Sequence, residues 1–305
     1  MFDWMRLSIR RKVLCPAAAC GHWGSPVFGM DGKACAECGG RLPDLGHPSK
    51  KPSVLAVAGT PQCGKTTWLA QACEVMQRGP ENWRIRCSGS SESWESLRKA
   101  AYLGKPPPST PALPGTAWQL ARVKERHLDH VFIHDTAGAE WADTQRLARY
   151  RAFQRLDGLV LVMDPFALPG LSRQYGSFVR DLRPPVMVAR EPFGDAHLSN
   201  LFQVLELFGC EVRNVSVAVV VTKLDVMGLS LKFESAQNAT LASGTGNCKR
   251  LLMEWGMANT IRLLENRFCR VAFFASFPST KGIFSAANPI NWSLGADIHS
   301  HPRDF

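Results

Sequence analysis

The chain has 305 residues, of which 45% are hydrophobic and 20% are charged. This composition is ordinary for a globular protein and excludes a largely disordered chain. The formal net charge is +10, but the basic residues are spread along the chain, so nucleic-acid binding is possible but not favoured. No apolar run reaches the roughly 20 residues that span a bilayer. With ten Cys and no recognisable export signal, we expect a cytoplasmic protein with reduced thiols and no transmembrane segment.

Four cysteines near the N-terminus are spaced like the ligands of a zinc ribbon. They form a C-x4-C pair and, after fourteen intervening residues, a C-x2-C pair: Cys15, Cys20, Cys35 and Cys38. Two such hairpin turns can bring four sulfurs to one tetrahedral zinc ion, which makes the site closed and structural. The first pair is looser than C-x2-C, so His22 is an alternative ligand, and four unrelated thiols are the alternative to a metal site. We expect the ribbon and its linker to occupy residues 1–48.

From residue 49 onwards, short apolar runs alternate with amphipathic stretches. The runs SVLAVA, HVFIHD, GLVLVM, VSVAVVV and RVAFFA read as buried strands, and TTWLAQACEVMQR, NLFQVLELFG and NCKRLLMEWGMANTIRLLENRF read as helices. This alternation predicts an α/β domain whose mainly parallel sheet is flanked by helices. We expect it to extend over residues 49–305, with a helical insertion around residues 166–213.

The stretch GTPQCGKTT follows the first of these strands and opens a helix. It matches the phosphate-binding pattern G-x-x-x-x-G-K-[ST] in the strand and helix context that the pattern requires. Backbone N–H groups and the helix N-terminus would surround phosphate oxygens, the Lys would reach the β- and γ-phosphates, and the first Thr would hold Mg²⁺. The predicted nucleotide-binding residues here are Gly59, Cys63, Gly64, Lys65, Thr66 and Thr67.

Two further boxes follow at the ends of later strands. HVFIHD ends in Asp135, which can hold Mg²⁺, and the D-x-x-G box closes with Gly138, whose N–H could approach a γ-phosphate. VAVVVTKLD supplies a T-K-x-D box: Thr222, Lys223 and Asp225. An ionised Asp can accept both the N1–H and N2–H protons of guanine, whereas adenine has the opposite polarity at that edge. This box therefore predicts guanine, and the FFAS stretch ending at Ser276 would offer an amide to the guanine O6.

The order GTPQCGKT, DTAG, TKLD and FAS resembles the Ras-like G domain of TRAFAC-class P-loop GTPases over about residues 53–295. The Cys-rich ribbon, the Pro-rich GKPPPSTPALPGT and the sequences DTAGAEW and RLLENRFCRVAFFAS resemble bacterial double-GTPase families, which are associated with conflict or defence systems. The resemblance implies a threonine that binds Mg²⁺ and the γ-phosphate before the second strand. Thr116 is the preferred candidate and Thr110 is the alternative.

The residue after D-x-x-G departs from the Ras-like pattern. Many Ras-like enzymes have a Gln here that orients the attacking water, but this chain has Ala139. Because Ala cannot hydrogen-bond water through its side chain, we expect slow unaided hydrolysis. Glu140 is a candidate substitute, the alternative being a solvated residue of the switch helix. The predicted catalytic residues are thus Lys65, Thr116, Gly138 and Glu140.

These motifs together predict a protein that binds GTP and GDP with Mg²⁺, and a separate structural Zn²⁺. We expect a slow or partner-stimulated GTPase that acts as a molecular switch toward an unidentified effector or activating protein. Two alternatives remain. One is a GTP-binding module that does not hydrolyse, favoured by Ala139, and the other is a nucleic-acid-associated ATPase, favoured by the ribbon and the positive charge.

Overall fold

We describe the protein from a computed structural model. The described residues are 12–29, 32–40, 42, 51–79, 83–88, 116–124, 127–171, 173, 189, 192–227, 248–279, 282–284 and 287–295. Thr110, most of the Pro-rich segment before Thr116 and the expected boundary at residue 48 lie outside these residues. The extent of the two domains therefore stays a prediction.

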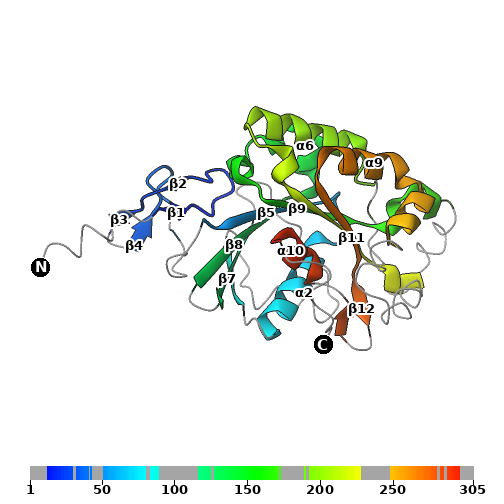
Figure 1. The fold of residues 1–305 in the computed structure, drawn as a ribbon, viewed down its shortest axis with the longest axis horizontal. Coiled ribbons are helices and arrows are strands. Elements are labelled where there is room, and N and C mark those ends of the chain that lie inside the picture. Colours follow the sequence, from blue (N-terminus) through cyan, green and yellow to red (C-terminus); the bar gives the residue numbers. More distant parts are fainter. Residues whose placement is uncertain are drawn as a thin grey trace, which may run out of the picture.

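Within the described residues, seven strands form one sheet in the order β11-β10-β9-β5-β8-β7-β6 (Figure 1). The strands are β5 (Ser53–Ala58), β6 (Arg84–Ser88), β7 (Thr116–Lys124), β8 (His127–Asp135), β9 (Gly158–Met163), β10 (Ser216–Val221) and β11 (Arg270–Ala275). Five neighbouring strands, β11 to β8, pair in parallel, while β7 runs antiparallel to both β8 and β6. The expected mainly parallel sheet is confirmed, and the antiparallel edge lies on one side of it.

The central strands are apolar because both faces of the sheet are covered. Every residue of β9 and β10 is buried, which is typical of parallel strands between two helical layers. The longer helices are α2 (Lys65–Arg78), α6 (Asp195–Leu207), α9 (Ala258–Arg267) and α10 (Asn288–Ser293). Helices α6 and α9 cover one face of the sheet, and α2 and α10 cover the other (Figure 1). The strand–helix alternation of the sequence thus becomes a three-layer α/β domain.

Shorter elements connect this framework. They are the 3₁₀ turns η1 (Gly138–Ala142), η2 (Arg151–Arg155), η3 (Pro165–Ala167), η4 (Val212–Asn214) and η5 (Leu224–Met227), the helix α4 (Thr144–Leu147) and the hairpin β12 (Phe277–Ser279) with β13 (Gly282–Phe284). Helix α6 lies in the segment where we expect an insertion, and it is part of the crossover between the neighbouring parallel strands β9 and β10. The elements η1, α4 and η2 follow the end of β8 and lead into β9.

The long C-terminal helix differs from its expected form. The sequence predicts one uninterrupted helix from residue 247 to 268, but a π-helical turn, η7 (Met253–Met257), precedes α9. Gly256 adopts φ 100° inside this turn, a left-handed conformation that only glycine adopts at little cost. The backbone of Trp255 packs against Gly170 at this point, where a Cβ on Gly170 would come within 2.8 Å of the Trp255 Cα.

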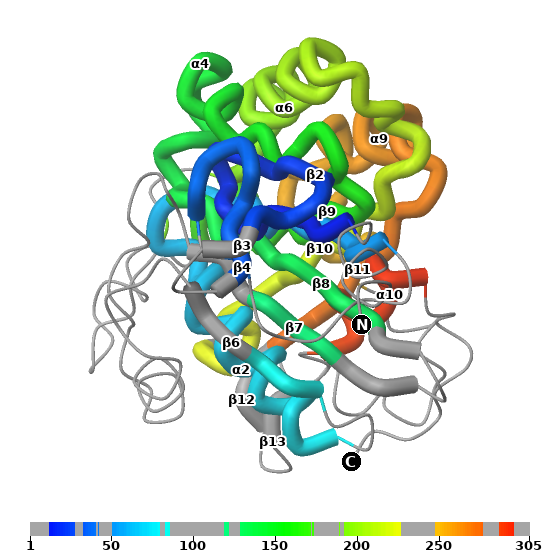
Figure 2. The backbone as a smooth tube through the Cα atoms, turned by 90° about the vertical axis from the view of Figure 1, so that its left-hand side faces the viewer, coloured from blue at the N-terminus to red at the C-terminus, as the bar shows by residue number. Residues whose placement is uncertain are grey.

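The N-terminal residues form two small antiparallel hairpins. They are β1 (Val13–Leu14) with β2 (Trp23–Gly24), and β3 (Val27–Gly29) with β4 (Gly32–Ala34). Figure 2 shows them lying together as one module in front of the main sheet. Leu14 and Ala18 belong to the same apolar cluster as residues of the main domain, so the module packs against it rather than standing apart.

Candidate functional site

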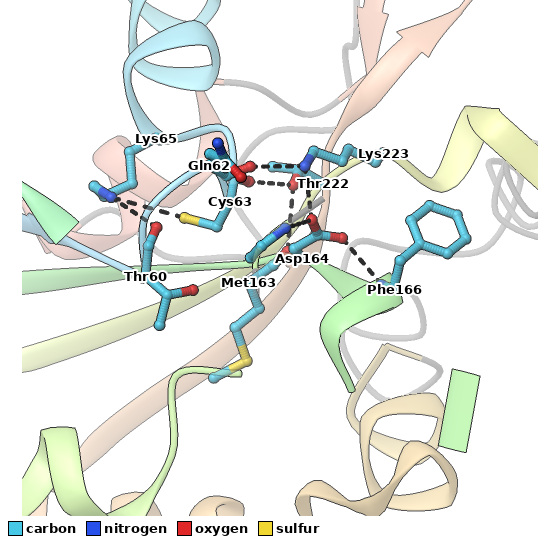
Figure 3. Close-up of polar contacts among 10 residues, drawn as sticks. Thr60, Gln62, Cys63, Lys65, Met163, Asp164, Phe166, Thr222 and Lys223 are labelled. Carbon is cyan, nitrogen blue, oxygen red and sulfur yellow. Dashed lines mark hydrogen bonds and ion pairs between the residues drawn. The ribbon is translucent and has the colours of Figure 1, made fainter. Parts of the chain in front are cut away.

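The phosphate loop, Gly59–Thr66, connects β5 to α2. Gly64 is the N-cap of α2, with φ 96°. The Lys65 side chain is buried, and its ammonium group donates to the carbonyl oxygens of Gly59, at 2.8 Å, and Thr60, at 3.0 Å (Figure 3). The loop thus curls around its own lysine at the N-terminus of a helix, the arrangement in which backbone N–H groups and the helix dipole favour bound phosphate.

The two side chains expected to hold Mg²⁺ at this loop meet each other. The Thr66 hydroxyl donates to the Asp135 carboxylate at 2.8 Å, although these residues lie on different elements. Oxygen ligands of this kind suit Mg²⁺, so the donor set fits the predicted ion. The backbone of Thr116 lies opposite Asp135 in the β7–β8 pairing, but its side chain is not described.

The DTAG loop, Asp135–Gly138, lies directly against the phosphate loop. A Cβ built on Gly138 would lie 2.4 Å from the Pro61 nitrogen and 2.7 Å from the Thr60 carbonyl carbon. Real Cβ atoms do not approach so closely, so only glycine fits without a backbone shift. The proximity places the Gly138 segment beside the loop that would hold the phosphates, as the D-x-x-G pattern predicts.

The Thr136 side chain connects the DTAG loop to the sheet and to the turn η1. Its buried hydroxyl donates to the Val57 carbonyl at 2.8 Å and accepts from the Trp141 indole N–H at 2.6 Å. Val57 belongs to β5 and Trp141 to η1. One hydroxyl therefore joins the sheet to the turn that follows the DTAG loop, and both of its polar capacities are used.

The TKLD loop, Thr222–Asp225, also contacts the phosphate loop, at the carbonyls of Gln62 and Cys63. The Thr222 hydroxyl lies 3.0 Å from the Cys63 carbonyl and 3.2 Å from the Met163 carbonyl. The Lys223 ammonium donates to the Gln62 carbonyl at 2.8 Å (Figure 3). Boxes about 160 residues apart in the sequence therefore form one continuous site at the carboxyl ends of parallel strands, where α/β folds bind ligands.

Asp164 is a residue of this site that the motifs do not single out. It follows β9, and its side chain is only 1% exposed. One carboxylate oxygen lies 2.7 Å from the Lys223 ammonium and accepts from the Ala189 N–H at 2.8 Å, and the other accepts from the Phe166 N–H. A charged residue at the end of a buried strand, as at Asp135, is the sequence signal that could have found it.

Asp225 and Ser276 are the remaining residues that we expect to contact the guanine base. Asp225 is exposed within η5, and partial desolvation of its carboxylate raises its pKa. Donors of a bound guanine would offset that desolvation. The Ser276 amide, in contrast, already donates to the Val221 carbonyl at 2.9 Å. This geometry does not favour the expected contact between the Ser276 amide and guanine O6, because each amide has a single proton to donate.

The two residues after the DTAG loop face different surroundings. Ala139 is exposed, whereas Glu140 is buried. The interpretation of Glu140 as a solvated residue is therefore wrong. Burial raises the pKa of Tyr150 well above its usual range, and the negative charge of Glu140 raises it further. The Glu140 carboxylate therefore makes ionisation of the Tyr150 phenol less favourable. The catalytic role expected for Glu140 stays a prediction.

The four N-terminal cysteines converge on one point. Their sulfurs all lie within 4.8 Å of one another, with Cys15 to Cys38 and Cys20 to Cys35 each 3.7 Å apart. A tetrahedron with metal–sulfur bonds of about 2.3 Å has edges of about 3.8 Å, so the set fits zinc. His22 is not part of this cluster among the described residues, and its imidazole lies against Gly24 instead.

The cysteines of this cluster differ in how their surroundings affect the thiolate. Burial acts to raise the pKa of Cys35, but hydrogen bonds from the Cys38 and Glu37 amides and from the Cys20 and Cys38 side chains together outweigh it, and the net shift is downward. Zinc binds the deprotonated sulfur. Burial raises the pKa of Cys15 and Cys20 in the first turn, so these surroundings favour a thiolate at Cys35 and oppose it at the other two.

The sheet order, the phosphate loop after β5 and the two boxes that contact it define a P-loop nucleotide-binding protein of the α/β class. A protein-family model narrows this class: the model of Double-GTPase 2 matches residues 53–283. The chain belongs to this double-GTPase family, and at the family level it is a GTP-binding GTPase. A comparison with curated proteins gave no match.

Among the described residues, no helix combines the length and the apolar character needed to cross a bilayer.

Proposed function

We propose that the chain is a Mg²⁺-dependent protein that binds GTP, hydrolyses it slowly and signals its nucleotide state to a partner protein. Membership of the double-GTPase family supports GTP binding and hydrolysis. The main support for the proposal is the contact between the TKLD loop and the phosphate loop. The side chains of Thr222 and Lys223 hydrogen-bond to the carbonyls of Cys63 and Gln62, respectively. A base bound at the TKLD loop would thereby adjoin phosphates bound at the phosphate loop.

The residue roles follow from position. The amides of residues 63–67 and the Lys65 ammonium would bind the phosphates. Thr66 and Asp135 would hold Mg²⁺ together with Thr116, and the ion would neutralise charge on the β- and γ-phosphates. The Lys223 stem would line the purine face, and the Asp225 carboxylate would accept the two guanine protons.

Hydrolysis would proceed by in-line attack of water on the γ-phosphorus, releasing GDP and phosphate. Lys65 and the loop amides would stabilise the charge that develops on the phosphate oxygens. The residue after the DTAG loop is exposed Ala139, whose methyl group cannot orient water. Unaided hydrolysis is therefore slow, and a partner that supplies an Arg would accelerate it by stabilising the charge of the transition state.

The contact between Gly138 and the phosphate loop supports a switch. The Gly138 backbone adjoins Thr60 and Pro61, so a γ-phosphate arriving there would meet the DTAG loop and change its position or order. A partner could read this change on the exposed part of η1. A place in a bacterial conflict or defence system is part of this proposal and rests on family resemblance alone.

Competition binding tests the proposal. Labelled GTP is displaced from the purified chain by GTP, GDP or ATP in Mg²⁺ buffer, and phosphate release is followed with excess GTP. We expect displacement by GTP and GDP at concentrations at which ATP is ineffective, and slow multiple turnover that Lys65→Ala abolishes. Tighter ATP binding would overturn the guanine assignment, and GTP binding without turnover would favour the non-hydrolysing module that Ala139 suggests.

A further inference from the structure

The N-terminal module contacts the main domain at the turn η2. We call residues Cys15–His22 the first knuckle. The Ala152 N–H, in η2, donates to the Ala18 carbonyl of this knuckle at 3.1 Å. Leu14 and Ala18 are both buried in the apolar cluster that contains Phe153. The knuckle is thus joined to η2 by a backbone hydrogen bond and by shared apolar burial.

Gly21 makes this contact closer than any other residue type would allow. It has φ +58°, and a Cβ there would lie 2.7 Å from the Ala152 Cα and 2.9 Å from the Ala152 nitrogen. Gly39 occupies the matching position after Cys38, in the second turn of the module. It has a similar φ of +68°, but no atom lies within 4 Å of the Cβ position. Of these two glycines, Gly21 therefore lies against the main domain and Gly39 does not.

From η2 the contacts lead to the DTAG loop. The Phe153 ring stacks on Trp141, with centroids 6.0 Å apart, and on Tyr150, at 5.4 Å. The Trp141 indole N–H donates to the Thr136 hydroxyl, which belongs to the DTAG loop. A continuous series of packed and hydrogen-bonded groups therefore joins the knuckle to the loop that lies against the phosphate loop.

The knuckle depends on its metal for a fixed shape. Strands β1 and β2 contain two residues each, and isolated hairpins of this size are marginal in water. The cysteines of the knuckle, Cys15 and Cys20, lie within the four-sulfur cluster. In small metal sites of this kind, binding free energy becomes folding free energy, so an ordered docking surface requires zinc.

We propose that zinc in the ribbon controls the nucleotide preference of the GTPase site. The zinc-loaded first knuckle holds η2, and through Phe153 and Trp141 it holds the DTAG loop beside the phosphate loop. This preorganises Gly138 for a γ-phosphate, which GTP has and GDP lacks. The inference rests on the proposed GTP-binding function. Coupling of this kind is reciprocal, so GTP also tightens zinc binding.

The test compares two glycine variants that keep all four cysteines. Gly21→Ala introduces a Cβ into the Ala152 backbone, whereas Gly39→Ala introduces the same left-handed strain into open space. Zinc content is measured for both, together with dissociation constants for GDP and a non-hydrolysable GTP analogue. We expect Gly21→Ala to weaken analogue binding relative to GDP by about five-fold or more, the lower range of known coupling, with Gly39→Ala unchanged.

A second route uses the unaltered chain. Zinc is removed with a zinc-selective chelator, the measurements are repeated in Mg²⁺ buffer, and zinc is then restored. We expect the same loss of preference, reversed by zinc. An unchanged preference in both stripped protein and Gly21→Ala would overturn the proposal, as would an equal effect in Gly39→Ala.

Hydrogen exchange separates this inference from the proposed function. Amide exchange over residues 138–155 is compared between the two variants without nucleotide. Faster exchange in Gly21→Ala alone supports the link between the ribbon and the DTAG loop, even if the chain proved not to bind GTP. Equal exchange in both variants would overturn the link, even if GTP binding is confirmed.

Discussion

Asp164, which is buried, and Lys223, which is partly buried, form an ion pair, 2.7 Å from carboxylate to ammonium, between the end of β9 and the TKLD loop. The same ammonium group holds the Gln62 carbonyl of the phosphate loop. Removing the Asp164 charge leaves the partly buried Lys223 ammonium without its ionic partner. Asp164 therefore positions the lysine that we expect to line the base.

Asp164→Asn should weaken guanine-nucleotide binding by about ten-fold, which corresponds to about 1.4 kcal/mol, within the range of a charge-assisted hydrogen bond. The amide keeps the size of the side chain but loses the charge that holds Lys223. Titration calorimetry with GDP measures the change. Asp157→Asn is the control, because Asp157 accepts the Val54 N–H at 2.8 Å before β9 starts. Equal loss in both variants would indicate general destabilisation and contradict the positioning role.

Asp225→Asn tests the base assignment. The Asn amide would place a donor against the N1–H or N2–H of guanine. Because a site built around a hydrogen bond strongly rejects a ligand that cannot form it, affinity for GTP should fall by about ten-fold or more. Xanthine has a carbonyl in place of the guanine amino group, so XTP affinity should rise. Competition of labelled GTP with XTP measures both. A variant that retains GTP preference would show that Asp225 does not read the base.

The framework of the fold could be predicted because its signals are local. The six-residue strands β5, β9 and β10 are apolar apart from the serine that opens β5 and β10, since both of their faces are covered, and α2 begins directly after the glycine of the phosphate loop. The edge strand β6 has the sequence RIRCS. Alternating polar residues on a short edge strand resemble a loop, and this strand was not predicted.

The missing parts of the site depend on contacts distant in sequence. The partner of Asp164 is 59 residues away, and nothing near Asp164 indicates Lys223. The contact of Gly21 with Ala152 likewise joins segments far apart, and a glycine after a cysteine is equally consistent with an ordinary turn. The cysteine spacing could predict the cluster, since four sulfurs at one metal need only two tight turns, but it could not predict where the module docks.

Metal analysis tests the Cys₄ site. Purified chain should contain one zinc per molecule, and Cys35→Ser should lose most of it, because a serine hydroxyl is a much poorer zinc ligand than a thiolate. Atomic emission spectrometry measures the metal. Cys269→Ser is the matched control, since Cys269 is exposed and its thiol donates to the Arg213 carbonyl instead. Full zinc content in Cys35→Ser would contradict the assigned ligand set.

Gly138→Ala should weaken the binding of a GTP analogue more than the binding of GDP. The added Cβ would come within 2.4 Å of the Pro61 nitrogen, so the DTAG loop must move away from the phosphate loop. Contact with a γ-phosphate is then lost. Affinity for a GTP analogue should fall by about ten-fold, which corresponds to the loss of one hydrogen bond to a charged group, while affinity for GDP should be nearly unchanged. Gly194→Ala, which meets no atom within 4 Å, is the control. A parallel loss for GDP would indicate damage to the whole site.

Ala139→Gln tests why hydrolysis is slow. Ala139 is exposed at the start of η1, so a longer side chain can be added there without repacking the interior. A Gln amide could orient the attacking water, and single-turnover hydrolysis should accelerate by up to about a hundred-fold, the scale on which positioning of a reacting group changes rates. Ala139→Leu adds similar bulk without the amide and should leave the rate unchanged. If both variants hydrolyse GTP at the rate of the unaltered chain, water orientation by residue 139 is not what limits the reaction, and an external group such as a partner's Arg becomes the missing element.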